Sequence, residues 1–111
     1  MIEVRISVDK KGPLSVQARG HSGYAPRGKD IVCAAVSTLM HALLLGLRDV
    51  VGIQDTVYEI DEEEPRFFIL WRESDLEDDR SRAVIDTVLR SLRSIADSYP
   101  KYVHIVEVNK K

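Results

Sequence analysis

The chain has very little cysteine and no excess of charge of either sign. Its 111 residues include a single cysteine, which excludes an intramolecular disulfide and with it a disulfide-stapled secreted domain. A lone thiol is typical of a protein in the reducing cytoplasm. The 16 basic and 18 acidic residues give a formal net charge of −2. The sequence therefore lacks the basic surplus that is typical of nucleic-acid-binding proteins, and we expect no nucleic-acid partner.

Long uninterrupted apolar runs are also missing. A membrane-spanning helix needs about 18 or more consecutive apolar residues. The most apolar stretch, residues 31–51, is interrupted by polar and charged side chains. Residues 1–5 have neither the basic start nor the apolar core of a signal peptide. We therefore expect a cytoplasmic protein that has no membrane partner.

The pattern of apolar residues predicts one α+β domain over residues 1–111. Apolar residues alternate over 2–8 and 14–18 around a turn, and again over 56–60 and 66–71 around an acidic turn, so each pair predicts a β-hairpin. A last strand is predicted near 103–108. These strands and two helices give the order ββαββαβ. That order favours a two-layer sandwich, in which a largely antiparallel sheet packs on two helices.

The two predicted helices have recognisable ends. The first covers residues 31–51, with Asp30 as a favourable N-cap and Gly52 as a stop. Because it is apolar nearly all round, we expect it to be deeply buried. The second begins at a capping box formed by Ser74 and Glu77 and ends before Pro100.

Cys33 lies where a thiol is expected to react. If Asp30 is the N-cap, Cys33 is the third helical residue, where exposed amides and the helix dipole favour an anion. An ordinary thiol, with a pKa of ~8.5, is only about 3% ionised at pH 7. A pKa of ~6 would make roughly 90% of it thiolate. The alternative is a small buried core residue that is chemically inert.

Three polar residues near Cys33 could support such chemistry. His21 follows the second predicted strand and could act as the general base for Cys33, or it could simply cap the strand end. Asp30 could cap the helix or orient His21. Ser37, one turn beyond Cys33 on the same face, could bind His21 or a substrate carbonyl, or it could bond back to its own helix.

Other combinations of polar residues are weaker candidates. A Ser37–His41 dyad would lie in the middle of a helix, without the helix-end amides that could hold an oxyanion. His104 falls in the last predicted strand, where a structural role is expected. No close-spaced pair of cysteine or histidine ligands is present, so we expect neither a metal nor a cofactor.

Taken together, these residues resemble the signature of the ribosomal-processing cysteine protease family, Prp. The resemblance covers essentially the whole chain and rests on Gly20-His21, the glycine-containing loop, the run Gly28-Lys29-Asp30-Ile31-Val32-Cys33-Ala34, and Ser37. It implies that Cys33 is the nucleophile and His21 the base, with Gly20, Asp30 and Ser37 supporting the site. One departure is Val36, which is bulkier than the small residue of the family pattern.

The resemblance also implies a biological role. It points to a cytoplasmic bacterial endopeptidase that forms a homodimer. Its substrate would be large-subunit ribosomal protein twenty-seven in lineages where that protein carries an N-terminal extension, which is cut just after an aromatic residue.

A thiolate mechanism makes further residues candidates. We expect backbone amides near Cys33 and Ala34 to stabilise the oxyanion. We expect the loop that contains Ser22, Gly23, Tyr24 and Gly28 to be mobile and to close over a peptide. Two alternatives remain open. One is a non-enzymatic, ribosome-associated peptide-binding module, and the other is a redox sensor that needs an exposed thiol but no histidine.

Overall fold

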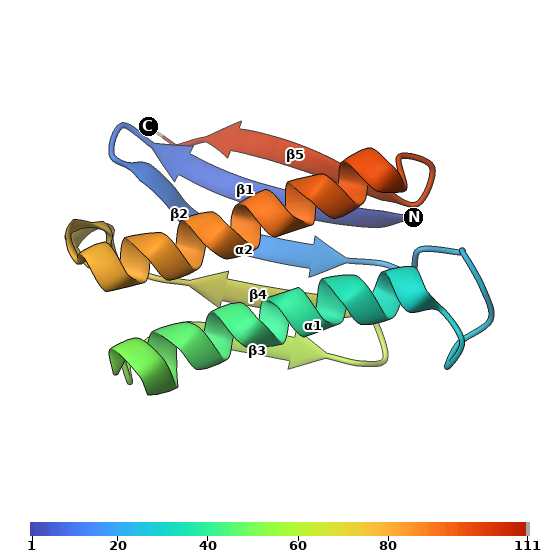
Figure 1. Ribbon diagram of the computed structural model, residues 1–111, viewed down its shortest axis with the longest axis horizontal. Helices are drawn as coiled ribbons and strands as arrows, with labels where there is room; N and C mark the ends of the chain where they lie inside the picture. Colours follow the sequence, from blue (N-terminus) through green and yellow to red (C-terminus); the bar gives the residue numbers. More distant parts are fainter. Residues whose placement is uncertain (111) are drawn as a thin grey trace.

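The computed structural model describes residues 1–110 and contains one five-stranded sheet with two long helices on one face (Figure 1). Lys111, the last residue of the predicted domain, lies outside the described residues. In chain order the elements are β1 (Ile2–Asp9), β2 (Gly12–Arg19), α1 (Ile31–Leu45), η1 (Gly46–Val51), β3 (Val57–Asp61), β4 (Arg66–Leu70), η2 (Glu73–Glu77), α2 (Asp79–Ser98) and β5 (Val103–Asn109). The predicted α+β class and the order ββαββαβ are confirmed.

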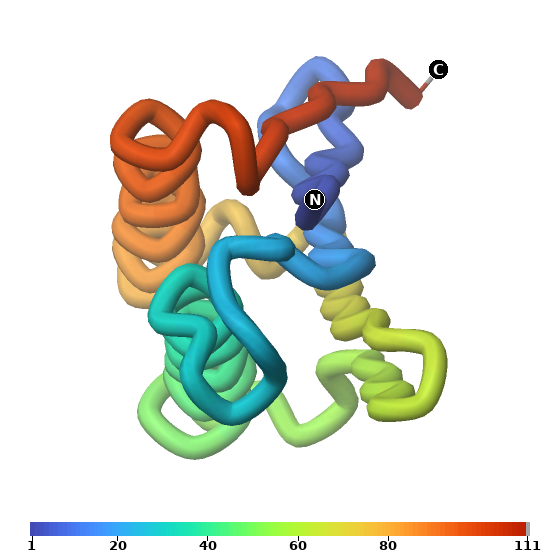
Figure 2. The backbone as a smooth tube through the Cα atoms, turned by 90° about the vertical axis from the view of Figure 1, so that its right-hand side faces the viewer, coloured from blue at the N-terminus to red at the C-terminus, as the bar shows by residue number. Residues whose placement is uncertain are grey.

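The sheet has the strand order β3-β4-β2-β1-β5. All neighbouring strands are antiparallel except β1 and β5, which are parallel. Viewed along the strands, both helices lie in one layer and the sheet in the other (Figure 2). The core between the two layers includes Val4 and Ile6 of β1 and Met40 of α1, which are essentially inaccessible to solvent. Alternation along the strands therefore places every second side chain against the helices.

The first helix differs from its prediction in burial. Its α-helical part ends at Leu45 and continues as a π-helical turn to Val51, and Gly52 then ends it in the left-handed conformation, with φ of 93°. Its inner face is buried, but Ile31, Leu45 and Val50 are 57%, 56% and 69% exposed. The expectation of deep burial was wrong, because in a two-layer sandwich the outer face of each helix remains in solvent.

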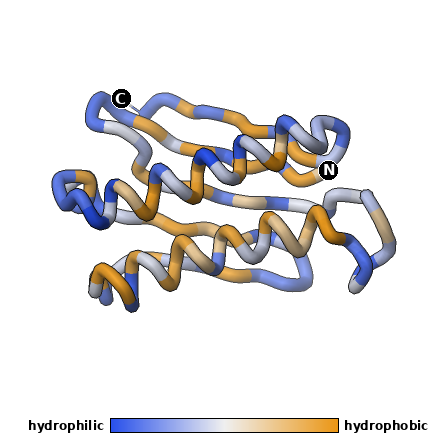
Figure 3. Tube along the Cα trace, in the orientation of Figure 1, coloured by the Kyte–Doolittle hydropathy of each residue, from blue (hydrophilic) through white to orange (hydrophobic). Residues whose placement is uncertain are grey.

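The apolar character of this helix is visible along the trace. In Figure 3, α1 is mostly apolar or neutral, whereas α2 alternates between polar and apolar residues. By length and composition alone, the helix over residues 31–51 is long and apolar enough to cross a membrane, whereas no segment was expected from the sequence to qualify. Core helices can pass the same test, and the inner face of α1, with Val32, Val36 and Leu43, packs into the core.

The start of the second helix also differs from its prediction. Ser74 does not cap α2. Instead the Asp75 side chain accepts a hydrogen bond from the amide of Arg72 at 2.9 Å, and this contact lies at the start of the short 3-10 helix η2. Asp78 then caps α2 by accepting from the amide of Arg80 at 2.8 Å. The chain contains several acidic residues here, and the sequence pattern alone could not decide which of them faces free amides.

Candidate active site

Gly20 directs the chain from β2 into the loop that carries His21. Its φ of 97° favours glycine, and a Cβ at this position would lie 2.6 Å from the carbonyl oxygen of Met1. Its amide donates to the carbonyl of Pro65 at 2.9 Å, which ties the loop to the turn between β3 and β4. The backbone thus explains why a side chain is excluded just before His21.

Asp30 is the N-cap of α1, as predicted. One carboxylate oxygen, Oδ1, accepts from the amides of Val32 at 3.0 Å and Cys33 at 2.9 Å. The other, Oδ2, accepts from the hydroxyl of Ser22 and from the amide of Ala25 at 3.4 Å. Burial opposes ionisation, but these hydrogen bonds outweigh it and lower the pKa of Asp30 to about 2. The carboxylate therefore joins the helix start to the loop, and among the described residues it makes no hydrogen bond with His21.

Cys33 is the third residue of α1 and is only partly buried. Its Sγ accepts a hydrogen bond from the backbone amide of Ser22 at 3.3 Å. An amide donor favours the ionised form of the atom to which it donates. The sulfur also faces a cavity rather than being enclosed by the core, which argues against the inert-cysteine alternative.

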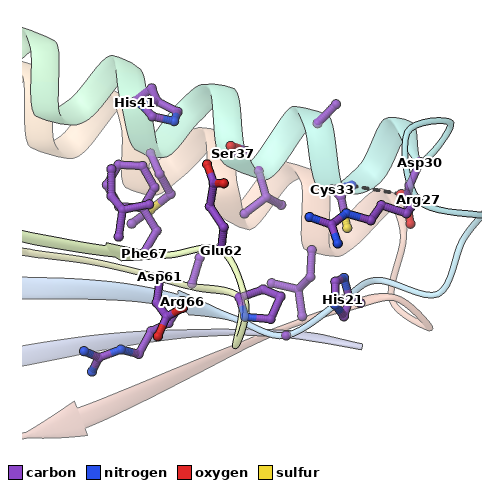
Figure 4. Close-up of a pocket in the computed structure, with 18 of the residues that line it drawn as sticks. His21, Arg27, Asp30, Cys33, Ser37, His41, Asp61, Glu62, Arg66 and Phe67 are labelled. Atoms are coloured by element: carbon purple, nitrogen blue, oxygen red, sulfur yellow. Dashed lines mark hydrogen bonds between the residues drawn. The ribbon is translucent and has the colours of Figure 1, made fainter.

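The cavity beside Cys33 has a volume of about 750 Å³ and lies between α1, from Cys33 to His41, and the end of the sheet (Figure 4). We call it the cleft. Along one wall, α1 presents Cys33, Ser37 and His41 in a row, while His21 lies on the opposite side, below Cys33. The two predicted catalytic residues therefore line the same cavity, although among the described residues no hydrogen bond joins them.

The remaining predicted site residues are distributed unevenly around the cleft. Ser37 is exposed in the cleft, and its hydroxyl makes no hydrogen bond within residues 1–110, so the back-bonding alternative is not seen. His41 packs edge-on against Phe67, with ring centroids 4.8 Å apart. His104 lies exposed on β5 and is not among the residues that line the cleft.

The predicted oxyanion donors are not free in this structure. The amide of Cys33 donates to the Asp30 side chain, and the amide of Ala34 donates to the Asp30 carbonyl at 3.1 Å. The expectation that these two amides hold the oxyanion is therefore not supported. The physical reason differs for the two amides: the aspartate N-cap uses that of Cys33, whereas that of Ala34 makes the first backbone hydrogen bond of the helix.

The predicted substrate loop divides into two parts. Gly23 and Gly28 line the cleft, as expected of residues near a bound peptide. Ser22 and Tyr24 do not line it. Ser22 is only 3% exposed and is bonded to Asp30, while Tyr24 packs edge-on against Tyr99 and against Tyr102 at the far end of α2. The expectation that these two side chains meet the substrate is therefore not supported.

Sequence reasoning missed much of the cleft wall opposite α1. Asp61 and Glu62, which the sequence showed only as part of an acidic turn, line the cleft, and so does Phe67, which is largely buried in the core. From the loop, Arg27 also lines it. No local pattern places the β3–β4 turn beside residue 20. That contact depends on the pairing of β2 with β4, in which Arg19 lies opposite Arg66 and Ser15 opposite Leu70.

A partly buried cysteine at a helix start, with a histidine across a cavity of peptide size, defines a cysteine hydrolase. Comparison with known proteins identifies the kind. The family described as Cysteine protease Prp matches residues 1–104, and the chain belongs to that family. It is a cysteine protease, and the alternatives of a non-enzymatic binding module and a redox sensor are not supported.

Named relatives agree with this assignment. The chain is 28% identical to the ribosomal processing cysteine protease Prp of Staphylococcus aureus over 107 residues, which cover 95% of this chain and 97% of the relative. It is also similar to the crystal structure of the essential S. aureus ribosomal processing protease with a covalently linked product peptide, with a TM-score of 0.79 and 26% identity over 96% of this chain and 99% of the other. The chain is also similar to the crystal structure of SMU.848 from Streptococcus mutans, with a TM-score of 0.81 and 27% identity over 99% of this chain and 96% of the other.

Proposed function

We propose that this protease removes the N-terminal extension of large-subunit ribosomal protein twenty-seven, with Cys33 as nucleophile and His21 as general base. The observation that carries the proposal is that both side chains line one cleft, with an amide donor on the sulfur. The S. aureus relative is a ribosomal processing protease that has been crystallised with a substrate peptide, and this supports a ribosomal-protein substrate here.

In the proposed reaction, His21 takes the proton of the Cys33 thiol, and the thiolate attacks the scissile carbonyl carbon. The carbonyl π bond breaks to give a tetrahedral oxyanion. His21 then gives its proton to the departing amine as the C–N bond breaks, which leaves a thioester on Cys33. Water, deprotonated by His21, hydrolyses the thioester and restores the thiol. His21 is exposed and makes no hydrogen bond among the described residues, so the proton transfer requires its side chain to turn toward the sulfur.

The walls of the cleft suit an extended peptide. Ala34 and Ile60 are apolar residues that line the cleft and are exposed in it, which supports an aromatic residue at the cleavage point. Ser37 offers a free hydroxyl one turn from Cys33, and we assign it a hydrogen bond to a substrate carbonyl. The side chain of Val36 is 2% exposed and belongs mainly to the core, so its bulk leaves the cleft open.

A peptide copy of the host ribosomal protein's N-terminus tests the function. We expect mass spectrometry to show one cut, just after an aromatic residue, with the wild-type protein. Cys33→Ala and His21→Ala should abolish cleavage while leaving the far-ultraviolet circular dichroism unchanged. His104→Ala is the matched control, since His104 is exposed but lies outside the cleft, and it should cleave at the wild-type rate. Wild-type cleavage by either cleft variant would refute the assignment.

We also propose that the protein acts in the cytoplasm as a homodimer. The exposed face of α1 supports this, because Ile31 and Leu45 would not remain in solvent at low cost. A shallow groove continues this face between α1 and α2, lined by small and apolar residues such as Ala35 and Leu39. Sedimentation should give twice the mass of 12.6 kDa, and Leu45→Asp should reduce it to one chain. A monomeric wild-type protein at micromolar concentration would contradict the dimer.

A further inference from the structure

Ser22 is an unusual loop residue. It immediately follows His21, and its neighbours His21, Gly23 and Tyr24 are all exposed, yet Ser22 is only 3% exposed. Serine is mostly found at protein surfaces, and a buried hydroxyl needs hydrogen-bond partners. The partners of Ser22 show what holds it there.

Three hydrogen bonds fix Ser22 in place. Its backbone amide donates to Sγ of Cys33 at 3.3 Å. Its hydroxyl donates to Oδ2 of Asp30 and accepts from the amide of Tyr24 at 3.1 Å. The hydroxyl is therefore already both donor and acceptor, which leaves it poorly placed to bind a substrate.

The carboxylate of Asp30 connects these contacts to the helix. Its Oδ1 holds the amides of Val32 and Cys33, while its Oδ2 holds the loop through Ser22 and Ala25. Of these two loop residues, Ser22 donates from its side chain and Ala25 from its backbone amide. Removal of its hydroxyl would free the segment that carries both the amide on the sulfur and the histidine next to it.

From these contacts we propose that Ser22 is a positioning residue of the protease. Its hydroxyl, clamped to Asp30, holds its own amide against Cys33 and holds His21 at the mouth of the cleft. The role of Ser22 in catalysis rests on the proposed function, whereas its effect on the thiol does not.

The chain allows a clean test, because Cys33 is its only thiol. The rate of alkylation by iodoacetamide as a function of pH reports how readily that thiol ionises. An amide hydrogen bond to an anion is worth roughly a tenfold change in an equilibrium, so we expect Ser22→Ala to slow alkylation at pH 6 by about 5- to 10-fold and to move the profile to higher pH. Ser22→Thr, which keeps the hydroxyl, should restore most of the rate.

Other groups in the cleft also contribute to any pH profile. Charged or titratable side chains that line it are His21, Arg27, Asp30, His41, Asp61, Glu62 and Arg66. The variants leave all of them in place, so the difference from wild type isolates Ser22. Ser15→Ala is the matched control, because Ser15 is also buried, at 4% exposure, but lies on β2 outside the cleft. Its alkylation profile should match that of the wild type.

Peptide cleavage gives a second readout. With a folded Ser22→Ala variant we expect kcat to fall about 10-fold while KM changes less than about twofold, because the hydroxyl holds the nucleophile rather than the peptide. An unchanged alkylation profile and an unchanged kcat in a folded variant would overturn the proposal. Loss through KM alone would also overturn it, since that would make Ser22 a substrate contact.

A measurement on the wild-type protein covers the case of a variant that does not fold. In NMR spectra, the amide proton of Ser22 should move downfield as the Cys33 thiol ionises, and it should lose that response after alkylation. The amide of Gly20 is the comparison, because it donates to a carbonyl and should respond far less. A chemical shift of the Ser22 amide proton that does not change as the Cys33 thiol ionises would refute the contact. If alkylation depends on Ser22 but no peptide is cut, the proposed function fails and this inference stands.

Discussion

The capping carboxylate of Asp30 should be the side chain in the loop that matters most for stability. Asp30→Ala removes the acceptor for the amides of Val32 and Cys33 and for the hydroxyl of Ser22. Loss of an N-cap typically costs about 1 kcal/mol, and stranding the loop donors adds about 1–2 kcal/mol. We therefore expect the free energy of unfolding to fall by about 2–3 kcal/mol. For a chain of this size that lowers Tm by roughly 8–12 °C.

The effect should also depend on pH with a definite sign. Hydrogen bonds lower the pKa of Asp30 to about 2 in the folded protein, below the ordinary aspartate value of ~3.9. Its contribution is therefore fully present above about pH 4 and is lost as the pH falls towards 2. In urea unfolding, the difference in free energy of unfolding between wild type and Asp30→Ala should be largest at pH 7. It should become smaller as the pH falls from 4 to 2.

A matched control separates this effect from general loss of charge. Asp97 is exposed near the end of α2 and forms no ion pair within the described residues, so Asp97→Ala should change the free energy of unfolding by less than about 0.5 kcal/mol. Equal destabilisation by Asp30→Ala and Asp97→Ala would refute the cap. A difference in free energy of unfolding between wild type and Asp30→Ala that stays constant from pH 7 to pH 2 would also refute it.

Three further outcomes are expected. Gly20→Ala should lower the free energy of unfolding by more than about 1 kcal/mol, because the added Cβ would meet the Met1 carbonyl. Gly23→Ala should lower it only by the strain of a positive φ, because the space around a Cβ at Gly23 is open. Equal losses of stability in urea unfolding would contradict this. Ser37→Ala should reduce cleavage in a peptide assay about 3- to 10-fold without abolishing it, and an undiminished rate would remove Ser37 from the site. Cys33 of the wild type should be alkylated rapidly at pH 6, and protection of the thiol in the folded protein would count against a reactive site.

Much of the fold could be predicted because local patterns determine it. Alternation over residues 2–8 and 14–18 gave the first hairpin, and Asp30 and Gly52 marked the ends of the first helical segment. The pairing of β5 with β1 could not be read locally, since parallel neighbours depend on how the chain crosses over the sheet. The burial of α1 was wrong for a related reason. Composition gives the average polarity of a helix and does not show how many of its faces find a partner.

The candidate site shows the same division. A histidine before a glycine loop and a cysteine at a helix start were visible in the sequence, and the structure brings both to one cleft. The cap at Asp30 was predicted, but the amide of Cys33 was also expected to hold the oxyanion. Capping and ligand binding compete for the same donors, and the sequence does not decide between them. The cleft wall from Asp61 to Phe67 depends on the β2–β4 pairing, a long-range contact that no motif records.

The most direct test of the account is to find where the substrate becomes attached. Excess protein is mixed with the ribosomal-protein peptide and quenched in acid within one turnover, and the digest is then analysed by mass spectrometry. The mechanism predicts that the N-terminal part of the peptide, ending in its aromatic residue, is joined as a thioester to the fragment that carries Cys33. Cleavage without an adduct on that fragment, or an adduct that survives in Cys33→Ala, would contradict the claim that this thiol is the nucleophile.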